Sequence, residues 1–187
     1  MGHAGRLAPA GLVFLGLMDL DLPLIPPALA NMATGYQPPS REWPRAVVDR
    51  GTPDFVTKAN EEWYDLSRQG GLFGDDREFL VAVALHEGGN DLWWARVRLA
   101  ESWDLVGAGS ASALGSGFGA PEFTALSVTG DVVAFCSSDT ASIGTVLAAG
   151  FSDLAGLRDL AEWKAGYPRT PRQEKAAARR WLEFIGQ

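Results

Sequence analysis

The sequence predicts an α+β domain in which a mainly antiparallel sheet of about five strands, within residues 78–149, is flanked by N-terminal and C-terminal helices. Short segments of alternating apolar residues gather in the middle of the chain, whereas helical periodicity appears on either side of them. The strand segments are joined by short turns rich in Gly, Asn and Asp, which are typical of hairpins. No β-α-β alternation occurs, so a parallel sheet is not expected.

The first 34 residues are expected to stand apart from the sheet. They contain an apolar run, Leu7–Met18, and a short helix around residues 26–34, and part of this segment is expected to be disordered. Residues 35–53 contain several prolines and glycines, which indicate an irregular connection. A single α+β domain then covers residues 35–187.

The apolar run has some features of a targeting signal. Arg6 precedes it, as in a secretory signal, and Ala28-Leu29-Ala30 offers a cleavage pattern. However, Asp19 and Asp21 interrupt the run, and a bilayer span needs about 20 apolar residues. We therefore expect no membrane anchor and a cytoplasmic protein, with secretion through residues 6–30 as the alternative.

The periodic elements begin after the irregular connection. A helix is expected with Thr52 as N-cap and Pro53 in its first turn, and Gly70-Gly71 would end it. Alternating residues then predict strands over Glu78–Glu87 and Leu92–Ser102, joined by a turn rich in Gly and Asn. These two strands form the first predicted hairpin.

A Gly- and Ser-rich segment from Gly107 to Gly119 separates this hairpin from the next one. The second hairpin pairs Glu122–Val128 with Val132–Ser137, and Ser142–Ala148 is a further strand. Two helices close the chain. We expect the first to be capped by Ser152 and to end at Gly166, and the second to begin with the capping box Thr170-Pro171-Arg172-Gln173.

Composition limits the possible functions. The 187 residues are 47% hydrophobic and 21% charged, which is typical of one globular domain. The net charge of −7 disfavours binding to DNA, RNA or anionic lipid. The single cysteine excludes an internal disulfide and fits a reducing compartment. Frequent Ala, Gly and Arg suggest a bacterial source with GC-rich DNA.

The Gly-rich segment lacks the features of a phosphate-binding loop. No lysine follows its glycines, and Ser112 stands where a dinucleotide fingerprint requires Gly. The 59 residues from Leu99 to Leu157 contain six acids and no Lys or Arg, which disfavours a nucleotide. We therefore expect either a surface loop or a lid over a neutral ligand, and no cofactor.

Candidates for catalysis are few. His86, at the end of a predicted strand, is the one plausible base, and Cys136, inside an apolar strand, is the one thiol. Because a reduced cysteine in such a strand usually acts as a small hydrophobe, we expect no catalytic residues. A small hydrolase that uses His86 and Cys136 under the Gly-rich segment is the alternative. The sequence contains no Cys pair, and no second His follows His86 in helical register, so no metal site is predicted.

Tryptophan is the most unusual component, with seven in 187 residues. Trp93 and Trp94 are adjacent in a predicted strand and must point to opposite faces, so a helix or a partner has to cover one of them. Exposed Trp beside Arg is typical of interface anchors. We therefore expect Trp94, Arg96 and Arg98 to form one contact stripe, with Trp43 as a second exposed aromatic.

These features favour a small acidic protein that acts by binding another protein. Its charge favours a basic partner. A role like that of an immunity protein or antitoxin, or of an accessory subunit beside an enzyme, requires no catalytic groups. A hydrolase or ligand-binding enzyme is the alternative, and neither nucleic acid nor membrane is expected as a partner.

Overall fold

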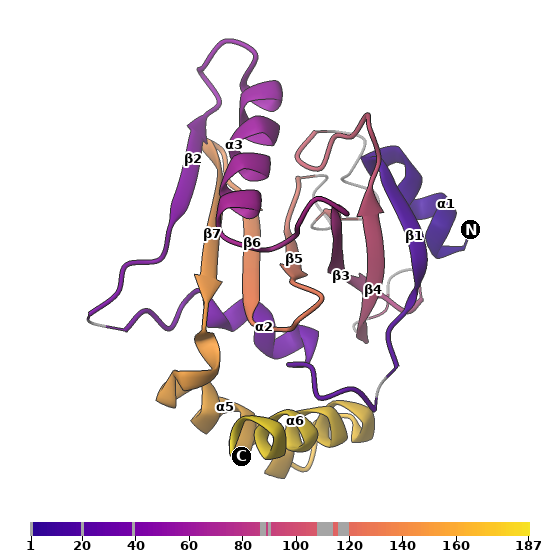
Figure 1. Ribbon diagram of the computed structural model, residues 1–187, viewed down its shortest axis with the longest axis vertical. Helices are drawn as coiled ribbons and strands as arrows, with labels where there is room; N and C mark the ends of the chain where they lie inside the picture. The colour runs from indigo at the N-terminus through magenta and orange to yellow at the C-terminus, as the bar shows by residue number, and fades with distance from the viewer. Residues whose placement is uncertain are drawn as a thin grey trace.

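The computed structural model describes residues 2–19, 21–38, 40–86, 89, 91–107, 114–115 and 120–187. In these residues, seven strands form one antiparallel sheet in the order β1-β4-β3-β5-β6-β7-β2 (Figure 1). The strands are β1 (Leu12–Leu17), β2 (Arg45–Asp49), β3 (Glu78–Ala84), β4 (Leu92–Leu99), β5 (Phe123–Leu126), β6 (Val132–Ser138) and β7 (Ser142–Ala149). The helices are α1 (His3–Leu7), η1 (Ala8–Ala10), α2 (Pro27–Ala33), α3 (Phe55–Gln69), η2 (Phe151–Asp153), α5 (Ala155–Gly166) and α6 (Arg172–Ile185). The predicted α+β class is confirmed, but the sheet is larger than the expected five strands.

Both predicted hairpins are present. β3 and β4 pair in a register that places Ala82 opposite Trp94, and β5, β6 and β7 follow as an antiparallel meander. β5 joins the two hairpins because it also pairs with β3. The first hairpin is shorter than predicted, since β3 ends at Ala84 and β4 ends at Leu99.

The two edge strands are additions to the prediction. β1 lies within the N-terminal apolar run and pairs with β4, so this part of the first 34 residues belongs to the sheet. β2 lies within the Pro-rich connection and pairs with β7. Neither strand alternates clearly, because β1 reads LVFLGL and β2 reads RAVVD. These segments form strands because they pair with β4 and β7, which are far away in the sequence, and a local pattern cannot show such pairing.

One face of the sheet packs under α3. Trp63 of this helix is fully buried, and the centroid of its ring lies 5.8 Å from those of Phe73 and Phe79 and 5.7 Å from that of Trp103. The buried strand residues of this layer include Leu12, Phe79, Val81, Ala95, Val97, Ala125, Ala134, Cys136 and Leu147.

The opposite face packs on α2, α5 and α6. Leu29 of α2, Leu157 of α5 and Trp181 of α6 are buried in this second layer. In Figure 1, α5 and α6 lie together below the strands, with α2 between them and the sheet. The sheet is therefore covered by helices on both faces, although part of β4 stays open, as described below.

The predicted N-caps do not form. Helix α3 begins at Phe55, α5 at Ala155 and α6 at Arg172, and none has a side-chain hydrogen bond at its N-terminus. Each begins beyond the residue predicted to cap it, which was Thr52, Ser152 or Thr170. Most helical stability in proteins comes from packing of an apolar face, which accounts for three helices without caps.

Asn60 of α3 fastens the segment that follows β4. Its side-chain Nδ2 donates to the Asp104 carboxylate at 2.8 Å, and its Oδ1 accepts the N–H groups of Leu105 at 3.0 Å and Val106 at 3.3 Å. Asn60 is 9% exposed, so its polar groups are satisfied inside the protein. Residues 104–106 are thus held against α3 without joining the sheet.

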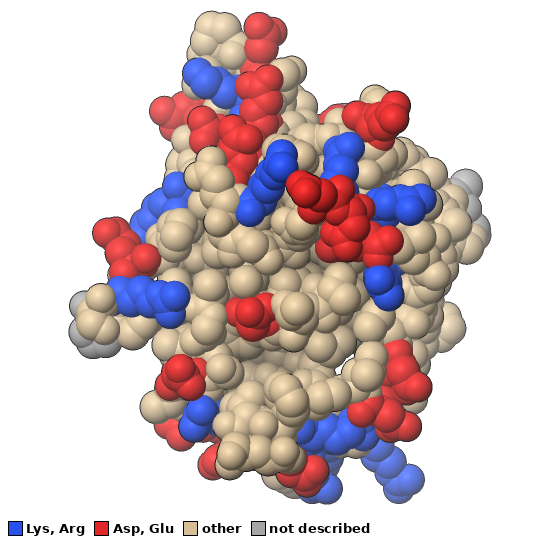
Figure 2. Space-filling model, viewed as in Figure 1, with Lys and Arg blue, Asp and Glu red and all other residues tan. Residues whose placement is uncertain are grey.

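Most of the predicted Gly-rich loop, residues 108–113 and 116–119, lies outside the described residues. Within it, Leu114 is buried and Gly115 forms a β-bridge with Pro121. No helix in the described part of the chain combines the length and the apolar character needed to cross a membrane. On the face shown in Figure 2, acidic and basic side chains are interspersed and do not gather into one patch of a single sign.

Candidate functional site

The stripe that the sequence predicted as an interface lies along β4. Leu92, Trp94, Arg96 and Arg98 alternate along this strand and share the face that carries α2, α5 and α6. Trp94 is only 6% exposed, and its indole Nε1 donates a hydrogen bond to the carbonyl oxygen of Ile25 at 2.7 Å. The expectation of an exposed anchor is therefore wrong at Trp94. The ring is covered by the chain itself, which agrees with the other possibility that the sequence left open, a covering helix in place of a partner.

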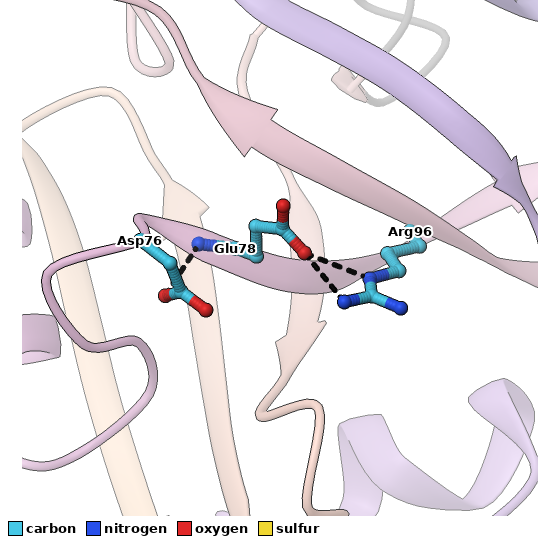
Figure 3. Close-up of polar contacts among 3 residues, drawn as sticks. All are labelled: Asp76, Glu78 and Arg96. Atoms are coloured by element: carbon cyan, nitrogen blue, oxygen red, sulfur yellow. Dashed lines mark hydrogen bonds and ion pairs between the residues drawn. The ribbon is translucent and has the colours of Figure 1, made fainter.

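Arg96 and Arg98 are exposed where the helices no longer cover β4. Arg96 reaches Glu78 on β3, with its Nη2 at 2.6 Å and its Nε at 2.9 Å from the same carboxylate oxygen (Figure 3). The Asp76 carboxylate accepts the N–H of Glu78 at 3.2 Å. Arg98 lies directly opposite Glu78 across the two strands, yet it forms no hydrogen bond or ion pair with any residue that the structure describes. The stripe thus presents one paired and one unpaired guanidinium.

Trp43 is also buried, so its predicted exposure is wrong. It is 2% exposed and packs in the same layer as Phe151 and Trp181. The guanidinium of Arg41 lies 5.1 Å from the centre of its ring, which is within reach of a cation–π interaction. The Trp43 indole N–H has no hydrogen-bond partner among the described residues. Packing beneath the C-terminal helices, rather than contact with a partner, accounts for this tryptophan.

A groove opens beside Trp94, between the first residues of α2, β4 and α6. It encloses about 340 Å³, and a smaller hollow of about 40 Å³ continues it over Ile25 and Trp94. We call the two together the α2–α6 groove. Its apolar lining includes Pro26, Pro27, Ala28, Leu92, Pro171 and Ala177.

Charged side chains at the α2–α6 groove are mostly acidic. Asp91 and Glu174 line the larger part, and Asp19 lines the continuation. Lys164 is the one cation on the described lining, and it forms an ion pair with Glu174 in which both side chains are about four-fifths buried. Asp19 and Asp91 form no ion pair within the described chain. Three acids and one lysine give this groove a formal charge of −2, which attracts a cationic group.

The structure does not bring the alternative catalytic pair together. Cys136 is fully buried in β6, and this burial raises the pKa of its thiol to about 12, which disfavours the reactive thiolate at neutral pH. His86 is exposed after β3, and no hydrogen bond joins it to Cys136. His86 instead lies near His3 of α1, whose pKa is lowered by burial, by the Arg6 guanidinium and by His86.

Metal-ligating groups do not converge in the described residues, where no three His, Cys, Asp or Glu side chains are placed to hold one ion. Ser110, Ser112 and Ser116 of the Gly-rich segment lie outside the described residues. Within the described chain, the α2–α6 groove and the adjoining β4 stripe are therefore the strongest candidate site.

The groove was not predicted from the sequence, because its walls come from four separate segments. Prolines at residues 26, 27 and 171 indicated helix starts, and Leu92 indicated a strand start, but no local signal places them together. Of the lining residues, the tryptophan pattern of the sequence singled out Trp93 and Trp94. Comparison with known proteins adds no relative: the chain matches no family model, no curated protein and no solved structure.

Proposed function

We propose that this protein acts by binding another protein, and that the α2–α6 groove receives an apolar side chain of the partner next to a Lys or Arg. One observation carries the proposal: an apolar hollow in which Asp19 and Asp91, the charges without an ion pair in the described chain, are both acidic. The net charge of −7 for the whole chain acts in the same direction, since it speeds encounter with a basic partner.

The size of the groove favours a side chain as its occupant. Its volume of about 340 Å³ is at the lower end of the range of roughly 300–1,000 Å³ for small-molecule and cofactor sites. Leu92 is 40% exposed at its edge and would lose this exposure on binding. Burial of apolar area contributes about 25 cal/mol per Å², so a well-filled hollow contributes measurably to affinity.

The β4 stripe extends the same surface. Arg96 and Arg98 follow Leu92 and Trp94 on one face of the strand, so a partner seated in the groove would also meet the arginines. Arg98 has no partner within the described chain, which leaves its donors available to an acceptor on the bound protein. Arginine is enriched at protein interfaces because its planar group forms several directed hydrogen bonds.

Such binding requires no catalytic group. An immunity-like or antitoxin-like role consists of occupying a basic partner, and an accessory role consists of holding an enzyme, so both depend on this contact alone. The buried thiol of Cys136 and the separate position of His86 favour such a role over the hydrolase alternative.

The test compares two lysine substitutions. In Leu92→Lys a cation enters the edge of the groove, whereas Leu15→Lys changes the same residue type at nearly the same exposure, 41% against 40%, away from the groove. Tagged protein of each type is used to capture partners from the native host at moderate salt. The captured partner is then purified, and its Kd is measured by calorimetry.

We expect Leu92→Lys to weaken binding of a basic partner at least tenfold, whereas Leu15→Lys and His86→Ala leave the Kd unchanged. Failure to capture a stoichiometric partner would contradict the proposal. Equal affinity of the Leu92→Lys and Leu15→Lys proteins would contradict the assignment of the groove. Loss of an activity in His86→Ala, with binding intact, would instead support the enzyme alternative.

A further inference from the structure

The two edges of the sheet differ in how well they are protected. At one edge, β1 is irregular, because its register with β4 shifts between Phe14 and Gly16, and helix α1 packs beside it with His3 stacked on Phe14. Bulges and covering helices are the usual means of blocking an edge strand. At the other edge, β2 has no such shift in register, although α3 contacts it on the face of the sheet where Val48 is buried. β2 pairs with β7 in unbroken register and forms the left border of the sheet in Figure 1.

The register of β2 shows which backbone groups face outward. Leu147 N–H donates to Pro44 O, and Arg50 N–H donates to Ala141 O, so the even-numbered residues of this segment bond to β7. In an antiparallel ladder the bonding residues alternate, and the N–H and C=O groups of Arg45, Val47 and Asp49 therefore point away from the sheet. The carbonyl of Asp49 accepts Thr52 N–H, which agrees with this direction.

The side chains of the same three residues lie on one face of the sheet, and their order is self-complementary. Val47 is at the centre and is 59% exposed, the highest value among the large apolar residues that the structure describes as exposed. A cation at residue 45 and an anion at residue 49 stand two positions to either side of it. Asp49 has no ionic partner in the described chain, and Arg45 has only an exposed contact of 3.5 Å with Glu42.

We propose that β2 pairs with β2 of a second copy of this chain, antiparallel and centred on Val47, so that the two sheets become one. In this register Val47 faces its own counterpart, and Arg45 of each copy lies opposite Asp49 of the other. All three positions carry outward backbone groups, so the two Val47 residues exchange two backbone hydrogen bonds. In each Arg45–Asp49 pair, Asp49 N–H donates to Arg45 O, because the Asp49 carbonyl already accepts Thr52 N–H within its own chain. Charges that only protect an edge strand from pairing can have any sign. Here a cation and an anion stand symmetrically about an apolar residue, and this arrangement favours pairing with a second copy.

The charge pattern allows a test that keeps the fold intact. Each substitution is present in both copies, so it alters both cross-strand pairs of the dimer. Arg45→Asp makes both pairs acidic, and Asp49→Arg makes both basic. Each variant should raise the dimer Kd about ten- to a hundredfold, given the size of cross-strand charge pairs. Mixed in equal amounts, the two variants should associate with each other, since every acidic position then meets a basic one. The double variant should self-associate like the unchanged protein.

Sedimentation velocity over a range of concentrations measures these states, with 20.0 kDa for one chain and twice that mass for a pair. Circular dichroism and thermal melting of each variant check that the fold is retained. The proposal holds if the unchanged protein pairs, the single variants do not and their mixture does. It is overturned if the unchanged protein stays monomeric, which would leave the β2 edge to another partner. It is also overturned if the folded single variants pair as well as the unchanged protein, or if mixing them restores nothing.

Discussion

Replacing Trp94 separates the burial found in the structure from the exposed anchor that the sequence predicted. The indole is 6% exposed, and its N–H donates to the Ile25 carbonyl at 2.7 Å. Truncating a buried Trp to Ala costs about 3–5 kcal/mol through lost burial and the cavity left behind. The Ile25 carbonyl loses its donor as well, which adds about 1 kcal/mol. We therefore expect Trp94→Ala to lower the free energy of unfolding by about 4–6 kcal/mol.

The chain supplies a matched control in Trp163. This residue is 55% exposed, and its ring stacks on Tyr167 with centroids 4.6 Å apart. Trp163→Ala should cost about 1 kcal/mol, because an aromatic pair contributes about 0.5–1.5 kcal/mol. Trp94→Phe keeps most of the ring and loses the hydrogen bond, so it should lie between the two.

Thermal melting followed by far-ultraviolet circular dichroism measures these effects. In a domain of this size 1 kcal/mol corresponds to about 2–4 °C, so Trp94→Ala should lower the Tm by roughly 10–20 °C. Urea unfolding gives the free energy directly. A cost below about 1 kcal/mol for Trp94→Ala, similar to that of Trp163→Ala, would refute the packing argument, since exposed residues are usually worth no more than this. The exposed-anchor interpretation would then stand again.

Further outcomes are expected at three residues, Asn60, Cys136 and Asp131. Asn60→Ala leaves the buried N–H groups of Leu105 and Val106 without an acceptor, so urea unfolding should show a loss of about 2–5 kcal/mol, and a loss below about 1 kcal/mol would contradict the bonding described here. Cys136 should resist a thiol reagent at neutral pH until the protein unfolds, and rapid native labelling would contradict its burial. The pKa of the Cys136 thiol is about 12 in the folded protein, which exceeds that of an unfolded thiol. The resulting contribution to stability is complete below about pH 8.5 and is lost as the pH rises toward 12. Cys136→Ala should remove this alkaline loss of stability. The pKa of Asp131 is shifted in the opposite direction, because a hydrogen bond from the Thr129 hydroxyl lowers it. The Tm difference between the unchanged protein and Asp131→Ala should be full at neutral pH and should shrink as the pH falls below about 4, and a difference independent of pH would contradict this origin.

The parts of the fold that local pattern determines were predicted well. Residues 78–99 and 122–149 alternate and are joined by short turns, so both hairpins could be recognised from the sequence. The edge strands β1 and β2 could not, because an edge strand contacts one neighbour and needs little alternation to do so. β1 is apolar at almost every position, which resembled a targeting signal, and β2 follows a group of prolines that indicated a loop.

The candidate site shows the same limit. The alternation of Trp94, Arg96 and Arg98 was correctly placed on one face of a strand, but whether a helix covers a given position of that face depends on where α2 and α6 cross it. Trp94 lies beneath those helices and the two arginines lie beyond them. Trp43 is a second example, because its place in the Pro-rich connection gave no sign that it is buried in the same layer as Phe151 and Trp181.

The two proposed contacts are physically independent because they lie at opposite ends of the sheet. The groove is beside β4, β2 is the far edge, and four strands separate them. With strands about 4.8 Å apart, pairing through β2 would set the two grooves of a dimer roughly 50 Å from one another. Neither contact would then block the other, and a dimer could hold two partners or two sites of one large partner. Arg45→Asp should consequently leave the Kd for a monovalent partner in solution unchanged while weakening attachment to a surface that displays many copies, where two linked sites act together.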